Sequence, residues 1–121
     1  MTAPTLYHYP GCSTCKNARK WLAAHGVEPK LIDLVATPPS AATLKKLWKR
    51  SGLPIAKLFN TSGQSYRGGG FKERLPSMSD DEALAALAAD GKLIKRPILV
   101  TADRVLVGFR DAAYAEAFAA S

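Results

Sequence analysis

The chain has very little cysteine: Cys12 and Cys15 are the only two in its 121 residues. Small secreted domains that rely on disulfides have several bridges, so the sequence excludes a disulfide framework. It also lacks the second pair of ligands that a zinc finger would need beside a C-x-x-C pair. We therefore expect the two cysteines to take part in chemistry.

Long hydrophobic runs are absent as well. No apolar stretch approaches the ~18 residues that cross a bilayer, and residues 1–5 contain neither the basic nor the apolar segment of a secretory signal. We expect a cytoplasmic protein with no membrane partner. Because area scaling predicts that a chain of this size buries about two-thirds of its surface, we also expect residues 1–121 to form a single domain.

Acidic residues are fewer than basic ones, with 10 Asp and Glu against 17 Lys and Arg and a formal net charge of +7. This excess suits an anionic partner. The basic residues are scattered without a block of five or six, and those at residues 45–50 are typical of the solvated face of a helix. We do not expect nucleic acid as a partner, and we predict a monomer.

Local patterns predict strands and a helix in the first third of the chain. Thr5 to Tyr9 mixes aromatic and aliphatic residues and stops at a Pro-Gly turn, as a short strand does. A helix should follow at once, because Cys15, Ala18 and Leu22 recur at helical spacing. Lys30 to Leu34 indicates a second strand, which should lie parallel to the first.

The rest of the chain predicts further helices and a hairpin. Residues 40–59 have a helical pattern with Ser40 as the N-cap, whereas residues 61–70 are rich in Gly and Ser and indicate a mobile loop. The later elements are a helix with a capping box at 79–82, a hairpin of strands 98–101 and 104–107, and a helix from Asp111. With a helical insert at about residues 40–78, this order is that of a thioredoxin-like α/β domain, a mixed sheet with flanking helices.

The motif Cys12-Ser13-Thr14-Cys15 stands between the first strand and the first helix. Cys12 should lie near the N-cap, where unpaired amides and the helix dipole stabilise a thiolate and lower its pKa. His8 and Lys16 would add positive charge. Cys15 falls on the apolar face one turn deeper, within reach of a mixed disulfide formed on Cys12. We therefore predict that Cys12 attacks and that Cys15 resolves.

Two other roles for the cysteines remain open. A zinc site would need four ligands, and only His8 and His25 remain to join the pair, one on the first strand and one at the far end of the first helix. Two buried structural thiols would suit Cys15 better than Cys12, which stands at a helix tip. Redox chemistry is the hypothesis that fits both positions.

Four segments of the sequence, the first of which contains the C-x-x-C motif, follow one another in a specific order along the chain. They are Tyr7-His8-Tyr9-Pro10-Gly11-Cys12-Ser13-Thr14-Cys15-Lys16, Leu58-Phe59-Asn60-Thr61-Ser62-Gly63 with Tyr66-Arg67, Ile94-Lys95-Arg96-Pro97, and Val107-Gly108-Phe109. Together they resemble the arsenate reductase (ArsC) and Spx family over nearly the whole chain. The resemblance implies a thioredoxin-like fold with a helical insert, Cys12 as the nucleophile, and His8 as a nearby modulator of its acidity.

The fold assignment also gives a role to Arg96. In thioredoxin-like folds the proline at the position of Pro97 is cis, and its turn brings the preceding residue against the cysteine loop. Arg96 should then place a guanidinium beside the Cys12 sulfur, where it would bind an oxyanion or a carboxylate. The residues expected to line this substrate or anion site are His8, Ser13, Thr14, Lys16, Asn60, Pro97 and Arg110.

The resemblance implies a thiol-dependent oxidoreductase. A Cys12 thiolate would reduce an arsenate-like oxyanion, or a disulfide or glutathione adduct, with electrons from glutathione, glutaredoxin or thioredoxin and with no bound metal or organic cofactor. Family arsenate reductases surround arsenate with three arginines. Arg96 matches one of these, the uncharged Asn60 stands at the second, and Arg110 lies near the third.

The alternative is a redox-sensing transcription regulator of the Spx type. Regulators of this type have a C-x-x-C pair, which they use as a redox switch, whereas arsenate reductases of the class have a serine where this chain has Cys15. They act by binding the α subunit of RNA polymerase. Under this alternative the chain would be a binding module rather than an enzyme.

Overall fold

A computed structural model of the chain describes residues 3–119, and these form two compact units. The first unit joins the described residues up to Asp33 to those from Arg96 onward, and the second unit is Leu34–Lys95. In this part of the chain, no helix has the length and apolar content needed to cross a membrane. That the two units behave as one domain, with an insert at about residues 40–78, stays a prediction.

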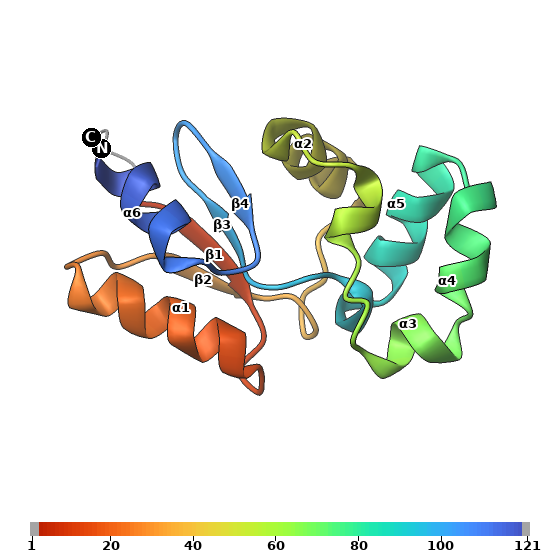
Figure 1. The fold of residues 1–121 in the computed structure, drawn as a ribbon, viewed down its shortest axis with the longest axis horizontal. Helices are drawn as coiled ribbons and strands as arrows, with labels where there is room; N and C mark the ends of the chain where they lie inside the picture. The colour runs from red at the N-terminus through yellow and green to blue at the C-terminus, as the bar shows by residue number, and fades with distance from the viewer. Residues whose placement is uncertain (1–2, 120–121) are drawn as a thin grey trace. The chain divides into compact units, whose positions relative to one another are not determined.

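The first unit contains a four-stranded mixed sheet, drawn in Figure 1. Strand β1 (Thr5–His8) pairs in parallel with β2 (Lys30–Asp33) and in antiparallel with β3 (Ile98–Val100). Strand β3 in turn pairs in antiparallel with β4 (Val105–Val107), so that the order in the sheet is β2-β1-β3-β4. The predicted parallel pair and the predicted hairpin are both confirmed.

Two helices, α1 (Ser13–Ala24) and α6 (Asp111–Ala119), pack against the same face of this sheet. Leu6 and Leu99 lie opposite each other in the β1–β3 register and form a core with Tyr114 of α6. The buried residues of α1 share one face of the helix and are Cys15, Ala18, Trp21 and Leu22. Because this apolar face rests on the sheet, the N-terminus of α1 is held at the end of β1.

The second unit consists of short helical segments. In chain order they are α2 (Ala41–Ser51), η1 (Ile55–Leu58), α3 (Gln64–Gly68), α4 (Phe71–Arg74), η2 (Leu75–Ser77), α5 (Asp80–Ala89) and η3 (Gly91–Leu93). The helices predicted from Ser40 and from residue 79 are confirmed. The Ser40 hydroxyl accepts the amide of Thr43 at 3.2 Å, and Gly52 ends α2 in the left-handed conformation that glycine adopts without strain.

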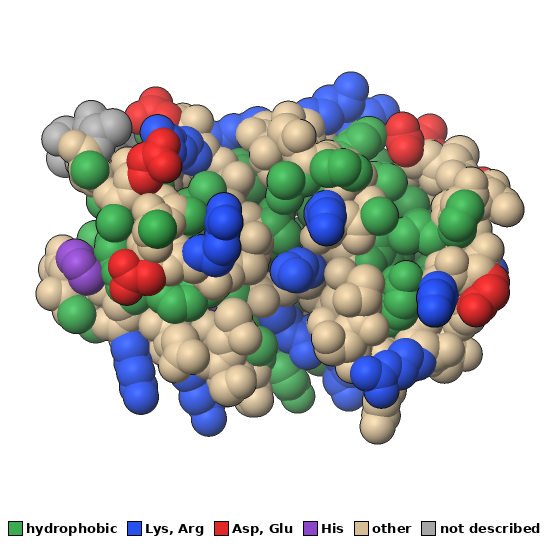
Figure 2. Space-filling view, viewed as in Figure 1, with side chains coloured by type: hydrophobic (Ala, Val, Ile, Leu, Met, Phe, Trp, Pro, Cys, Tyr) green, Lys and Arg blue, Asp and Glu red, His purple; other side chains and the backbone are tan. Residues whose placement is uncertain are grey.

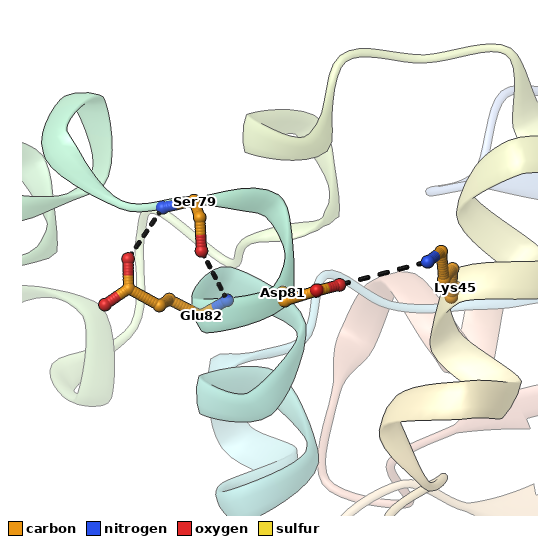
Figure 3. Close-up of polar contacts among 4 residues, drawn as sticks. All are labelled: Lys45, Ser79, Asp81 and Glu82. Atoms are coloured by element: carbon orange, nitrogen blue, oxygen red, sulfur yellow. Dashed lines mark hydrogen bonds and ion pairs between the residues drawn. The ribbon is translucent and has the colours of Figure 1, made fainter.

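The predicted capping box at the start of α5 is present (Figure 3). The Ser79 hydroxyl accepts the Glu82 amide at 3.1 Å, and the Glu82 carboxylate accepts the Ser79 amide at 2.8 Å. The hydrogen bond from the Ser79 amide lowers the pKa of Glu82. Lys45 and Asp81 form an ion pair at 3.9 Å between α2 and α5. Since both side chains are exposed, we expect this pair to contribute less than about 1 kcal/mol.

The prediction of a loop throughout residues 61–70 is wrong, because α3 occupies Gln64–Gly68. The ring of Tyr66 packs against Phe71, with centroids 6.2 Å apart, and against Phe59 at 6.4 Å. These contacts reach residues outside the segment, which is why its own pattern showed no helical period. Gly70, with φ at 66°, is the N-cap of α4, so the three glycines form a junction between two helices.

Candidate active site

Cys12 lies at the junction of β1 and α1, where the sequence places it. It is the N-cap of the helix, with an extended backbone conformation, and its carbonyl accepts the amide of Lys16 at 3.0 Å. Its own amide donates to the carbonyl of Tyr9 at 3.0 Å. The turn is therefore closed by backbone hydrogen bonds on both sides of Cys12, and the sulfur stands at the N-terminal end of α1.

The surroundings of the Cys12 sulfur favour its anion. Burial by itself raises the pKa of this half-buried thiol. That effect is outweighed by the backbone amide and the thiol of Cys15, which favour the anion, and by a hydrogen bond and the positive charge of the Arg96 guanidinium. The net result is a pKa below the ordinary value of a cysteine, so that more of Cys12 is thiolate at neutral pH than in a free thiol.

Cys15 has the opposite character. Its side chain is fully buried on the apolar face of α1, and its sulfur accepts the amide of Tyr9 at 3.5 Å. Burial raises the pKa of Cys15 to about 12; the hydrogen bond from Tyr9 opposes this rise only in part, and a thiolate at Cys12 adds to it. Cys15 is therefore a protonated thiol held against a sulfur that readily loses its proton. Both cysteines are free.

Arg96 brings a guanidinium to this sulfur from a distant part of the sequence, the second segment of the first unit. The Arg96–Pro97 peptide bond is cis, as predicted, and Pro97 is buried. The guanidinium donates a hydrogen bond to Cys12 and lies over the ring of Tyr9, with Cζ 5.2 Å from the ring centroid. A thiolate, a helix N-terminus and a guanidinium in one place can bind and attack an electrophile that carries a negative charge.

The expectation that His8 adds positive charge is wrong. His8 is only 6% exposed and lies opposite Asp33 in the β1–β2 register. Burial lowers the pKa of His8, the positive charge of Arg19 lowers it further, and Asp33 opposes the change. The ring is therefore neutral at neutral pH. Its influence on the acidity of Cys12 stays a prediction.

The other residues predicted for the site lie in different places. Ser13, Thr14 and Lys16 are exposed in the first turns of α1, next to Cys12. Arg110 is exposed immediately before α6. Asn60 belongs to the second unit, where it is half-buried. Its backbone N–H donates to the carbonyl of Leu93 at 2.8 Å. Their roles in substrate binding stay predictions.

The two histidines do not join the cysteines as zinc ligands. His25 is the C-cap of α1, and its ring stacks on Trp21 with centroids 3.7 Å apart. His8 lies on β1, beyond the other end of the helix. Among residues 3–119, no three His, Cys, Asp or Glu side chains gather closely enough to hold a metal ion. The zinc alternative thus lacks its ligands in this part of the chain.

Sequence reasoning missed Tyr9, which contacts Cys12, Cys15 and Arg96. Its backbone bonds to both cysteines and its ring lies under Arg96. An aromatic residue between a strand and a Pro-Gly turn that leads to a cysteine was the available signal. That pattern does not state which way the ring points, so only the structure relates it to Arg96.

The first prediction concerns the rate at which Cys12 is alkylated as a function of pH. We expect an inflection below the value of about 8.5 that a free thiol shows, because only the thiolate attacks and its pKa is lowered here. The rate should rise with pH through that inflection and then level off. The Cys15→Ser protein provides a single-cysteine background, and Cys12→Ser is the blank. An inflection at or above the free-thiol value would contradict this account of the site.

The fold and the two-cysteine site define a thioredoxin-like thiol protein, and comparison with known proteins gives its family. A sequence model of the ArsC family matches residues 7–117. The chain is 48% identical over 115 residues to the uncharacterized protein YusI of Bacillus subtilis, which covers 95% of this chain and 98% of YusI. It is 32% identical over 96 residues to an arsenate reductase of Rhizobium meliloti, which covers 79% of this chain and 67% of the reductase. The chain belongs to the ArsC family.

Two more relatives bear on its fold and function. The crystal structure of an ArsC family related protein from Bacteroides fragilis has a TM-score of 0.91 and 40% identity, with 95% of this chain and 97% of that chain covered. The regulatory protein MgsR of Bacillus subtilis is 29% identical over 105 residues, which is 87% of this chain and 82% of MgsR. The thioredoxin-like α/β fold expected from the sequence is confirmed.

Proposed function

We propose that the chain is a thiol-dependent oxidoreductase that works through a Cys12 thiolate and a Cys15 thiol. The observation that carries the proposal is the contrast between the two sulfurs. Cys12 is half-buried with a lowered pKa, whereas Cys15 is fully buried with a pKa of about 12. A pair in which one thiol is readily deprotonated and the neighbouring thiol stays protonated suits a two-step reduction.

The reduction of a disulfide takes place as follows. The Cys12 thiolate attacks one sulfur of the substrate, the other sulfur leaves as a thiolate, and a mixed disulfide remains on Cys12. The Cys15 thiol then gives its proton to the departing group, attacks the Cys12 sulfur and releases the second half of the substrate as a thiol. Two electrons have passed to the substrate, and the enzyme holds a Cys12–Cys15 disulfide.

An oxyanion such as arsenate would follow the same sequence. The Cys12 thiolate displaces hydroxide from arsenic and forms a sulfur–arsenic bond. The Cys15 thiol gives its proton to an oxygen on arsenic and attacks the Cys12 sulfur. This attack breaks the sulfur–arsenic bond and leaves its electron pair on arsenic, which departs as arsenite, reduced by two electrons. Arg96 is the cation that would hold the oxyanion or the carboxylate of a glutathione adduct, since it already donates to the Cys12 sulfur.

The oxidised enzyme must be returned to its dithiol form. Two molecules of glutathione, or one molecule of dithiol glutaredoxin or thioredoxin, supply the two electrons required. These donors are kept reduced in the cytoplasm, where we propose that the chain acts. A steady-state screen of arsenate, a glutathione mixed disulfide and a model disulfide against the three donors tests the proposal. The proposal fails if no combination turns over faster with the native chain than with Cys12→Ser.

A redox-sensing regulator of the Spx type is the second candidate. It is favoured by the relation to the regulatory protein MgsR and by the presence of two cysteines one helical turn apart. Under this proposal the Cys12–Cys15 pair reports the redox state, and the partner is the α subunit of RNA polymerase. Capture of that subunit by the oxidised chain and not by the reduced chain, without turnover in the screen, would favour the regulator.

The second prediction is that oxidation joins Cys12 to Cys15 within one chain. Cys15 already donates a hydrogen bond to the Cys12 sulfur, so little movement is needed to form the bond. Mass spectrometry should show the loss of two hydrogens, and a non-reducing gel should show a monomer. A disulfide-linked dimer would contradict the assignment of Cys15 as the resolving thiol. Stoichiometric zinc, lost together with structure on chelation, would favour the metal alternative instead.

A further inference from the structure

The Arg96 guanidinium needs support to stay at the Cys12 sulfur. An arginine side chain has several freely rotating bonds, and each one that is fixed costs conformational entropy. Arg96 is half-buried, so part of its long side chain remains open to solvent. A second group in contact with the guanidinium would help to keep it in place between reactions.

The ring of Tyr9 is such a group. The Cζ atom of Arg96 lies 5.2 Å from the centroid of this ring, within the distance of about 6 Å at which a cation is attracted to an aromatic face. The ring also lies against Gly11. A Cβ atom built on Gly11 would be 3.1 Å from Cε2 of Tyr9, so a side chain at that position would press on the ring. The missing side chain leaves room for the ring next to the turn.

The backbone of Tyr9 is tied to both cysteines. Its amide donates to the Cys15 sulfur at 3.5 Å, and its carbonyl accepts the Cys12 amide at 3.0 Å. These bonds set the position of the Tyr9 Cα relative to the two sulfurs. The ring that contacts the guanidinium therefore belongs to a residue whose backbone is fixed relative to both cysteines. Backbone bonds are retained when only the side chain is replaced, so the effect of the ring can be measured separately.

We propose that Tyr9 is a positioning residue, whose ring holds the Arg96 guanidinium at the Cys12 sulfur. The inference deepens the proposed oxidoreductase function, and it concerns the same site. Tyr9 acts through Arg96 and does not itself exchange electrons or protons with the substrate. Its hydroxyl has no part in the contact, since the aromatic face provides the attraction.

The test compares two replacements of Tyr9 by the alkylation of Cys12 in the Cys15→Ser background. Tyr9→Leu removes the ring, and we expect the rate below the wild-type inflection to fall roughly 2- to 30-fold, the range that a cation–π contact supplies. The plateau at high pH, where all Cys12 is thiolate, should not change. Tyr9→Phe keeps the ring and should retain the wild-type rate. Tyr9→Met is a second variant without a ring, should Tyr9→Leu not fold.

Combination with Arg96→Ala shows whether the ring works through the guanidinium. Once Arg96 is absent, Tyr9→Leu should have no further effect on the alkylation rate. Equal effects of Tyr9→Leu with and without Arg96 would overturn the proposal, as would a wild-type rate in Tyr9→Leu. Because alkylation needs no substrate or electron donor, these results do not depend on the outcome of the screen that tests the proposed function. A failed screen with the expected alkylation rates would reject the oxidoreductase and leave the role of Tyr9 intact.

Discussion

Replacement of Arg96 by alanine should lower kcat/KM for an anionic substrate by roughly 10- to 150-fold. The guanidinium is the cation that donates to the Cys12 sulfur, and a charge-assisted hydrogen bond contributes about 1.5 to 3 kcal/mol. Arg96→Lys should recover only part of the loss, because a point charge does not reproduce the two-pronged geometry of a guanidinium. Steady-state kinetics with the best substrate of the screen provides the measurement.

A matched control is available in the same unit. The Arg104 guanidinium pairs with Glu116 at 3.4 Å on the surface, so Arg104→Ala removes an equal charge without touching this contact to Cys12. Its kcat/KM should stay close to that of the native chain. If Arg96→Ala left every thiol-transfer rate unchanged and abolished binding to the polymerase α subunit, the regulator would replace the enzyme as the proposed function.

The second large effect is expected at Gly91, where no side chain fits. A Cβ atom there would collide with the carbonyl oxygen of Leu34 and would lie 2.7 Å from its carbonyl carbon and 2.9 Å from the Cα of Val35. All three neighbours are backbone atoms, so the chain itself would have to move. We expect Gly91→Ala to lower the free energy of unfolding by about 3 kcal/mol or more, measured by denaturant titration.

The control for this change is Gly68, at the end of α3. Apart from its chain neighbours and the backbone of its own helix, no atom lies within 4 Å of a Cβ built on it, and its φ is not positive. Gly68→Ala should therefore leave the free energy of unfolding within about 0.5 kcal/mol of the native value. Similar unfolding midpoints for the two variants would mean that the approach of Gly91 to Leu34 is not tight.

The sequence predicted those elements whose determinants lie close together in the chain. The capping box joins Ser79 to Glu82, and the apolar spacing of α1 is complete within one helix, so both could be recognised. Helix α3 is different because its stability depends on rings at Phe59 and Phe71, on either side of it. A segment that gains its stability from its neighbours has no period of its own to detect.

The candidate site shows the same limit in its electrostatics. The position of Cys12 at the N-cap and the depth of Cys15 follow from helical spacing. The place of Arg96 came only with the family resemblance, because it is far from both cysteines in the sequence. The expected positive charge of His8 is wrong, because burial and the nearby Arg19 lower its pKa. Neither the burial nor the neighbour can be read from a strand pattern.

The Cys12 thiolate raises the pKa of Cys15, and this effect bears on the order in which the two thiols react. While Cys12 is a thiolate, its charge and the hydrogen bond it accepts keep Cys15 protonated, and a buried thiol in that form resists oxidants and electrophiles. When Cys12 becomes part of a covalent adduct, that charge disappears and with it one cause of the high pKa of Cys15. Under the proposed mechanism, Cys15 therefore becomes easier to deprotonate once Cys12 is bound to substrate, although its burial still raises its pKa. This change favours the attack of the second thiol after the first has reacted.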